Sequence, residues 1–113
     1  MKTTELTGAP LNLAVARAQG YFCDGQSLTR PDPLDDGALE HIWLADYDPA
    51  GDWAQGGPII ERERIELEHD GFTWWARIKA DDDHTGTTAL IAAMRCYVAR
   101  KLGDELATPE VTT

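Results

Sequence analysis

The chain has 113 residues, of which 20 are acidic and 10 basic, and its formal net charge at pH 7 is −10. Repulsion by this charge argues against binding to DNA, RNA or an anionic membrane surface. A small phosphorylated ligand held by a few arginines is compatible with it, because salt screens carboxylates beyond about 8–10 Å. The length and an apolar fraction of 42% indicate one domain with its own core.

Neither the cysteines nor the amino-terminal sequence indicates export. Cys23 and Cys96 belong to no metal or redox motif, so we expect reduced thiols. The start, MKTTELTGAP, lacks the apolar core of a signal peptide, and no stretch has the length of a membrane span. The sequence therefore predicts a protein of a reducing cytoplasm, without a membrane partner.

The first predicted element is a helix over residues 10–19. Thr7 or Gly8 can cap it, Pro10 suits its first turn, and Gly20 suits a left-handed end. Residues 21–58 look irregular, because RPDPLDDGA and DYDPAGDWAQGGP are rich in turn-forming residues. We expect a long surface loop there, anchored by a short helix or an extended piece around residues 39–44.

The second half of the chain has clearer periodicity. Ile65 and Leu67 alternate with glutamates, and a second alternating run follows Asp70-Gly71, which is typical of a β-hairpin. One helical turn over residues 58–62 can precede the first strand, and DDDHTGT at 81–87 is interpreted as a polar loop. The segment TTALIAAMRCYVARKLG predicts a helix capped by Thr87 or Thr88 and ended by Gly103.

These elements predict an α+β fold. A small antiparallel β-hairpin or sheet packs with an N-terminal helix and a longer C-terminal helix, and a long irregular loop region connects them. Residues 4–105 would form the single domain and residues 106–113 a flexible tail. Trp74 and Trp75 are adjacent on a strand, so they must face opposite sides of it, and the sequence leaves open which one is buried.

No pattern indicates catalysis. The histidines are scattered without metal-ligand spacing, and Gly56-Gly57 belongs to neither a phosphate-binding loop nor a dinucleotide fingerprint. DDDH at 81–84 could hold a cation, but a solvated loop is the simpler interpretation. We therefore expect no catalytic residues, no metal and no cofactor, and a protein that is not an enzyme.

The stretch GDWAQGGPIIERER favours ligand binding. An indole can stack on a planar ring, paired glycines let a backbone approach an anion, and guanidinium groups hold phosphate. The candidate ligand-binding residues are Trp53, Gln55, Gly56, Gly57, Pro58, Ile59, Arg62, Arg64, Trp75 and Arg95. The structural alternative is that Trp53 packs on the hairpin, the glycines only turn the chain, and Arg62 pairs with Glu61 or Glu66.

Three blocks of sequence carry a family resemblance. ELTGAPLNLAVARAQGY, DWAQGGPIIERE and TALIAAMRCYVARKLGDE resemble, in that order, the NinX-like family of small proteins from lambdoid phages and prophages. The similarity spans residues 4–105. The family assigns no catalytic residues, so none is transferred. The resemblance implies a phage accessory protein that acts in the cytoplasm of the infected bacterium.

Within that setting, two hypotheses come from different classes. The first is a counter-defence protein that binds and sequesters a nucleotide-type immune signal, such as a cyclic nucleotide or an ADP-ribose derivative, in a pocket of a homo-oligomer. The second is an acidic protein that inhibits a host protein by direct contact or by DNA-like charge mimicry. The alternative to charge mimicry is that the surface carboxylates only keep the protein soluble.

Overall fold

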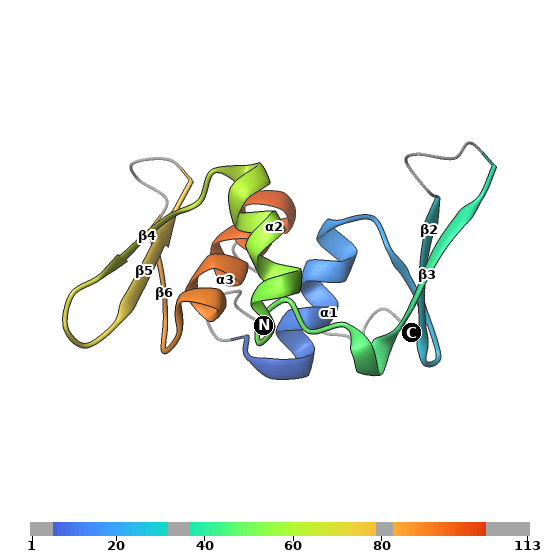
Figure 1. Cartoon of the computed structure of the whole chain (residues 1–113), viewed down its shortest axis with the longest axis horizontal. Coiled ribbons are helices and arrows are strands. Elements are labelled where there is room, and N and C mark those ends of the chain that lie inside the picture. The colour runs from blue at the N-terminus through green and yellow to red at the C-terminus, as the bar shows by residue number, and fades with distance from the viewer. Residues whose placement is uncertain (1–5, 32–36, 79–82, 104–113) are drawn as a thin grey trace.

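The structure, a computed structural model, describes residues 6–31, 37–78 and 83–103 (Figure 1). Within these ranges the chain forms three α-helices, one short 3-10 helix and two three-stranded antiparallel sheets, so the α+β prediction is confirmed. The elements in chain order are α1 (Gly8–Ala18), β1 (Phe22–Asp24), β2 (Ser27–Pro31), β3 (Leu39–Trp43), η2 (Leu44–Asp46), α2 (Trp53–Glu63), β4 (Glu66–His69), β5 (Trp74–Arg77), β6 (His84–Gly86) and α3 (Ala89–Leu102). The predicted tail, residues 106–113, lies outside the described residues.

The two sheets lie at opposite ends of the molecule, and the three helices lie between them (Figure 1). The sheet β1–β2–β3 packs beside α1, and the sheet β4–β5–β6 packs beside α3. One buried cluster joins the three helices to β2 and β5, and its largest fully buried side chains include Leu11, Leu28, Met94 and Tyr97. The helical layer therefore supplies most of the core.

The predicted N-terminal and C-terminal helices are confirmed as α1 and α3. In α3, the Thr88 hydroxyl accepts a hydrogen bond from the Ile91 amide at 3.1 Å, and Gly103 is the C-cap. Ala92 and Ala93 are fully buried, which brings the helix backbone close to its neighbours. A Cβ on Gly86 would lie 2.5 Å from the Ala92 amide nitrogen, so β6 reaches α3 because Gly86 has no side chain.

The irregular region predicted for residues 21–58 is wrong over most of its described length, although the extended piece expected around residues 39–44 is confirmed as β3. Residues 22–31 and 39–43 form the first sheet, in which Leu28 pairs with Cys23 on one side and with Ile42 on the other. The strands have three to five residues, and apolar side chains occur on both of their faces. A period of two was therefore absent from the sequence, although the backbone forms a ladder.

The turns predicted for DYDPAGDWAQGGP are wrong at their second half, because residues 53–63 form helix α2. The Asp52 carboxylate accepts a hydrogen bond from the Ala54 amide at 3.0 Å and caps the helix. Gly56, Gly57 and Pro58 all lie inside α2. Gly56 is buried against Pro49 and Leu90, so packing outweighs the turn preference of Gly-Gly-Pro.

The predicted hairpin is confirmed as β4 and β5, with residues 70–73 as its connection. A third strand, β6, was missed. Residues 84–86, expected to be part of a polar loop, pair with β5, and His84 is buried. Asp81 and Asp82 lie outside the described residues. Trp74 packs against the core, and Trp75 lies on the opposite face of β5.

Candidate functional site

The residues predicted for ligand binding lie mostly on α2, where most of them hold the fold together. Trp53 is 55% exposed at the start of the helix. The Gln55 side-chain oxygen accepts a hydrogen bond from the Asp48 amide, and its nitrogen donates to the Asp46 carbonyl, both at 2.8 Å. Pro58 is exposed and Ile59 is buried in the core. Gly56 and Gly57 are helical, so the proposed bend for an anion does not exist.

The arginines predicted to hold phosphate are separated by the fold. Arg62 donates to Glu63 at 2.8 Å and to the Tyr97 hydroxyl at 3.2 Å, so the alternative pairing with Glu61 or Glu66 is wrong in its partners. Arg64 is exposed and ends α2 in a left-handed conformation with φ of 55°.

Arg95 and Trp75 are next to the second sheet and have structural partners there. Arg95 donates to the backbone carbonyls of Leu6 and Thr85, each at 2.8 Å, and burial lowers the pKa of its guanidinium. The Trp75 indole donates to the Asp70 carboxylate at 2.8 Å. The structure therefore does not gather the ten predicted residues into one site.

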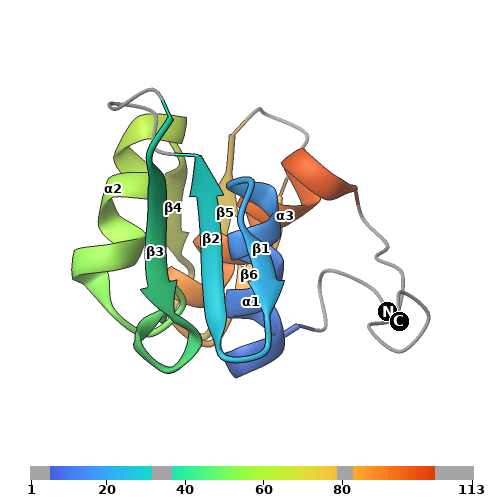
Figure 2. The ribbon, with the colours of Figure 1, turned by 90° about the vertical axis from the view of Figure 1, so that its right-hand side faces the viewer.

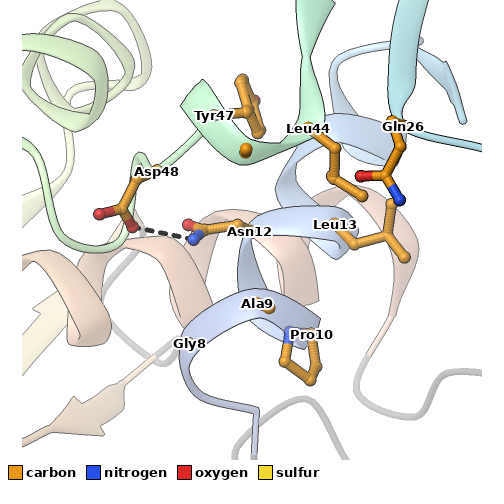
Figure 3. A pocket seen from close by; sticks show the side chains of 10 residues that line it. Gly8, Ala9, Pro10, Asn12, Leu13, Gln26, Leu44, Tyr47 and Asp48 are labelled. Atoms are coloured by element: carbon orange, nitrogen blue, oxygen red, sulfur yellow. Dashed lines mark hydrogen bonds between the residues drawn. The ribbon is translucent and has the colours of Figure 1, made fainter.

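A pocket lies between the start of α1 and η2, and we call it the α1–η2 pocket (Figure 3). Its volume is about 630 Å³, within the range of ligand-sized pockets. Its lining residues are Gly8, Ala9, Pro10, Asn12, Leu13, Gln26, Leu44, Ala45, Tyr47 and Asp48. Most of these are small or apolar, so the pocket offers a hydrophobic wall with a few polar groups.

One wall of this pocket is held from two sides. Asn12 on α1 donates to the Asp48 carboxylate at 2.8 Å (Figure 3). It also accepts a hydrogen bond from the Ala50 amide at 2.9 Å. Gln55 on α2 holds the backbone of Asp48 from the other side. A Cβ on Gly51 would lie 2.5 Å from the Asp48 carboxylate, so this position admits only glycine without movement. The wall is therefore formed before any ligand arrives.

The charge of this pocket is negative. Among the described residues that line it, Asp48 is the only charged one. Gln26 and Asn12 add amide groups, and the Tyr47 hydroxyl already accepts a hydrogen bond from Gln19 at 2.6 Å. Such a pocket suits an apolar group that carries a cation or a hydrogen-bond donor, and it offers no cation to a phosphate.

A second hollow has the opposite charge. Its volume is about 220 Å³, and it is lined by Ala18, Gln19, Arg30, Arg62, Glu63, Tyr97 and Lys101, which we call the cation pocket. Glu63 lies 2.8 Å from Arg62 and 3.8 Å from Lys101, and Glu40 lies 2.7 Å from Arg30. Burial raises the pKa of Tyr97, so its hydroxyl stays neutral. The carboxylates offset most of the positive charge.

Sequence reasoning missed the residues that build the α1–η2 pocket. One signal was present in the sequence, because Asn12 lies between Leu11 and Val15, two apolar residues of the first helix. In the structure Asn12 is on the buried side of this helix and is only 8% exposed. A polar side chain in an apolar stripe must have a partner. Its partner, Asp48, is 36 residues away, so the sequence alone could not identify it.

Residues 2–101 match the family of bacteriophage P22 NinX. The chain belongs to this family. The matched range includes all the described secondary structure up to the last turn of α3. No curated protein matches this NinX family member. Within the described residues, no helix is long and apolar enough to cross a membrane, and no group of three acidic, histidine or cysteine side chains is placed to hold a metal ion.

Proposed function

We propose that this NinX family member is a non-enzymatic phage accessory protein that binds a host protein directly in the bacterial cytoplasm. The observation that carries this proposal is the α1–η2 pocket, which is mostly apolar and preformed, and whose described lining has one charged group, Asp48. Its chemistry suits an apolar side chain next to a lysine or arginine of the partner. The net charge of −10 would steer the approach of a basic protein surface.

The test uses two exposed alanines, Ala45 in the pocket and Ala54 on α2 outside it. A photo-crosslinking amino acid at each position, in chains expressed in infected bacteria, identifies proteins captured from position 45 alone. The affinity of that purified protein is then measured by calorimetry for Ala45→Arg and Ala54→Arg.

We expect Ala45→Arg to weaken binding by roughly tenfold or more, since it fills the pocket and adds a charge that repels a basic partner. Ala54→Arg should have little effect. Added salt should weaken the wild-type complex. If position 45 captures no host protein that position 54 does not, or if both variants bind equally well, the proposal is wrong.

A second candidate function is sequestration of a small phosphorylated, nucleotide-like signal of the host. The observation that favours it is the cation pocket, where Arg30, Arg62 and Lys101 come from three different elements. Guanidinium groups bind phosphate through paired hydrogen bonds, and the Tyr97 hydroxyl adds a further donor. Glu63 and Glu40 would have to release their arginines, which weakens this candidate.

Thermal unfolding with a panel of cyclic nucleotides and ADP-ribose derivatives tests this second function. Sequestration predicts a higher unfolding temperature with one ligand, loss of that shift in Arg62→Ala, and recovery of intact ligand after the protein is heated. Arg77→Ala is the matched control, because Arg77 also forms an ion pair with a carboxylate at 2.8 Å but lies on β5, outside the lining of the cation pocket. No shift with any ligand, or equal losses in both variants, would exclude it.

A further inference from the structure

The outer face of the sheet β1–β2–β3 is unusually apolar for an exposed surface. Leu28 and Ile42 pack in or against the core, so the side chains of their strand neighbours lie on the opposite, outer face of the sheet. Figure 2 is viewed from the side of this outer face. This outer face consists of Phe22, Asp24, Ser27, Thr29, Pro31, Leu39, His41 and Trp43. Phe22 is 74% exposed, Leu39 71% and Trp43 55%.

The outer face of the sheet β4–β5–β6 has a different composition from the outer face of β1–β2–β3. There, Glu66 pairs with Arg77 and Glu68 pairs with Trp75. Arg77 forms an ion pair with Asp83, and the Trp75 indole donates to Asp70. That face carries charged side chains, and Arg77 and Trp75 on it are each bound to an aspartate. The two sheets therefore differ in their outer faces, and three exposed apolar side chains, Phe22, Leu39 and Trp43, gather on the face of β1–β2–β3.

We propose that the outer face of β1–β2–β3 is the surface through which two copies of this chain associate. Two molecules of charge −10 repel each other, so they can meet only where that charge is sparse. Of the eight described residues of this face, Asp24 alone is acidic. A second copy brings the same sparse charge and the same exposed apolar groups, which makes the face self-complementary.

The arrangement of the side chains suits a two-fold symmetric pair. β1 and β3 are the two edges of the sheet, with β2 between them. A two-fold axis parallel to β2 places β1 of one copy over β3 of the other, so Phe22 meets the edge that carries Leu39 and Trp43. The His41 and Trp43 rings are already in edge-to-face contact, with centroids 4.9 Å apart, which presents a firm surface.

The expected strength follows from the size of the face. Three strands about 4.8 Å apart, with about 3.3 Å per residue, form a small interface. Interfaces of this size belong to the weak, concentration-dependent class. The dimer should therefore form reversibly as the protein concentration rises. Added salt should strengthen it, because screening reduces the repulsion between the two acidic bodies.

The chain offers matched controls. Trp43 and Trp53 are both 55% exposed, and Phe72, at the tip of the β4–β5 connection, is 94% exposed against 74% for Phe22. Sedimentation over a wide concentration range, at low and high salt, compares the wild type with Trp43→Glu, Phe22→Glu, Trp53→Glu and Phe72→Glu. Circular dichroism confirms that each variant is folded. We expect the first two variants to weaken dimerisation by roughly tenfold or more, and the last two to leave it unchanged.

Three outcomes would overturn the inference. A wild-type chain that stays monomeric at every concentration and salt condition has no such dimer. Equal losses in Trp53→Glu or Phe72→Glu would place the interface elsewhere. A monomer whose Phe22 and Trp43 are instead needed to bind a basic host protein, in a complex weakened by salt, would assign this face to that protein.

Discussion

At the scale of single residues, polar side chains fix the loops of this protein. Asn12 and Gln55 hold the segment around Asp48 from two helices. Asp70 has a similar role at the β4–β5 connection, where its carboxylate accepts hydrogen bonds from the Phe72 amide at 2.9 Å and the Thr73 amide at 2.8 Å. Such local bonds replace ladder bonds where the chain turns.

Asp70 should make stability depend on pH in the acid range. Hydrogen bonds from the Trp75 indole and from the Thr73 and Phe72 amides lower the pKa of its carboxyl from 3.8 to about 2. A lowered pKa stabilises the fold above pH 4, and this contribution disappears as the pH falls toward 2. The unfolding temperatures of wild type and Asp70→Ala should therefore converge between pH 4 and pH 2. Asp70→Asn, which accepts hydrogen bonds without titrating, should differ from Asp70→Ala by a constant amount; convergence there too would contradict this role.

Arg64 is in a backbone conformation that favours glycine. Its φ of 55° ends α2 in the left-handed region, which costs a residue with a side chain about 1–2 kcal/mol. Arg64→Gly should raise the free energy of unfolding by about 0.5–1 kcal/mol, after the larger entropy of glycine in the unfolded chain. The control is Glu61→Gly, which also introduces glycine, but at an exposed position inside α2. It should lower the free energy of unfolding by about 1 kcal/mol. Urea denaturation measures both, and effects of the same sign would disprove the explanation.

At the scale of elements, the reliable predictions were those with strong periodicity and standard caps. The helix of residues 89–102 had both, and the hairpin of residues 66–77 had alternation and the Asp70-Gly71 turn. The strands of the first sheet lacked a period, and α2 contained a turn sequence, so tertiary contacts decided both. Pro58 removes one hydrogen bond within α2, and Gly57 before it has no Cβ to clash with the proline ring.

The packing of α2 predicts unequal effects of two adjacent substitutions. A Cβ at Gly56 would overlap the Pro49 carbonyl oxygen and lie 2.6 Å from Leu90, so Gly56→Ala should lower the free energy of unfolding by about 1–3 kcal/mol. A Cβ at Gly57 would meet only Trp53, at 3.9 Å, apart from its neighbours in the chain. Gly57→Ala should therefore cost less. Thermal unfolding compares the two, and a larger loss at Gly57 would mean that α2 does not pack as described.

At the scale of the whole molecule, charge and core are separated. The helices between the two sheets carry the core, and the outer faces of the sheets differ, one charged and one apolar. A small protein of charge −10 needs a surface of low charge density wherever it binds another acidic body. The apolar face of β1–β2–β3 is such a surface, whereas the α1–η2 pocket carries the carboxylate of Asp48 and suits a basic partner.

The two cysteines differ in burial, so their reactivity distinguishes the surface of the protein from its core. Cys23 is exposed on β1, and Cys96 is fully buried in α3. A thiol reagent such as Ellman's should modify Cys23 at once and Cys96 only when the protein unfolds. In Cys23→Ser the fast phase should vanish and the slow phase should remain, accelerating with added urea. Fast modification of two thiols in the folded protein would contradict the buried position of α3.

The sequence by itself determined the α+β class, the N-terminal and C-terminal helices and the hairpin, because helical period, alternation and capping residues are local properties. It also determined the NinX family, because blocks of the sequence resemble that family and residues 2–101 match it. It also identified the stretch around residues 53–64 as unusual, but gave it the wrong conformation. Only the tertiary structure decided that Gly56 packs in a helix, that Arg62 and Arg95 lie apart, and that Asn12 meets Asp48 to wall a pocket. These contacts join residues far apart in the chain, and the free energy of packing them outweighs local preferences that a sequence pattern records.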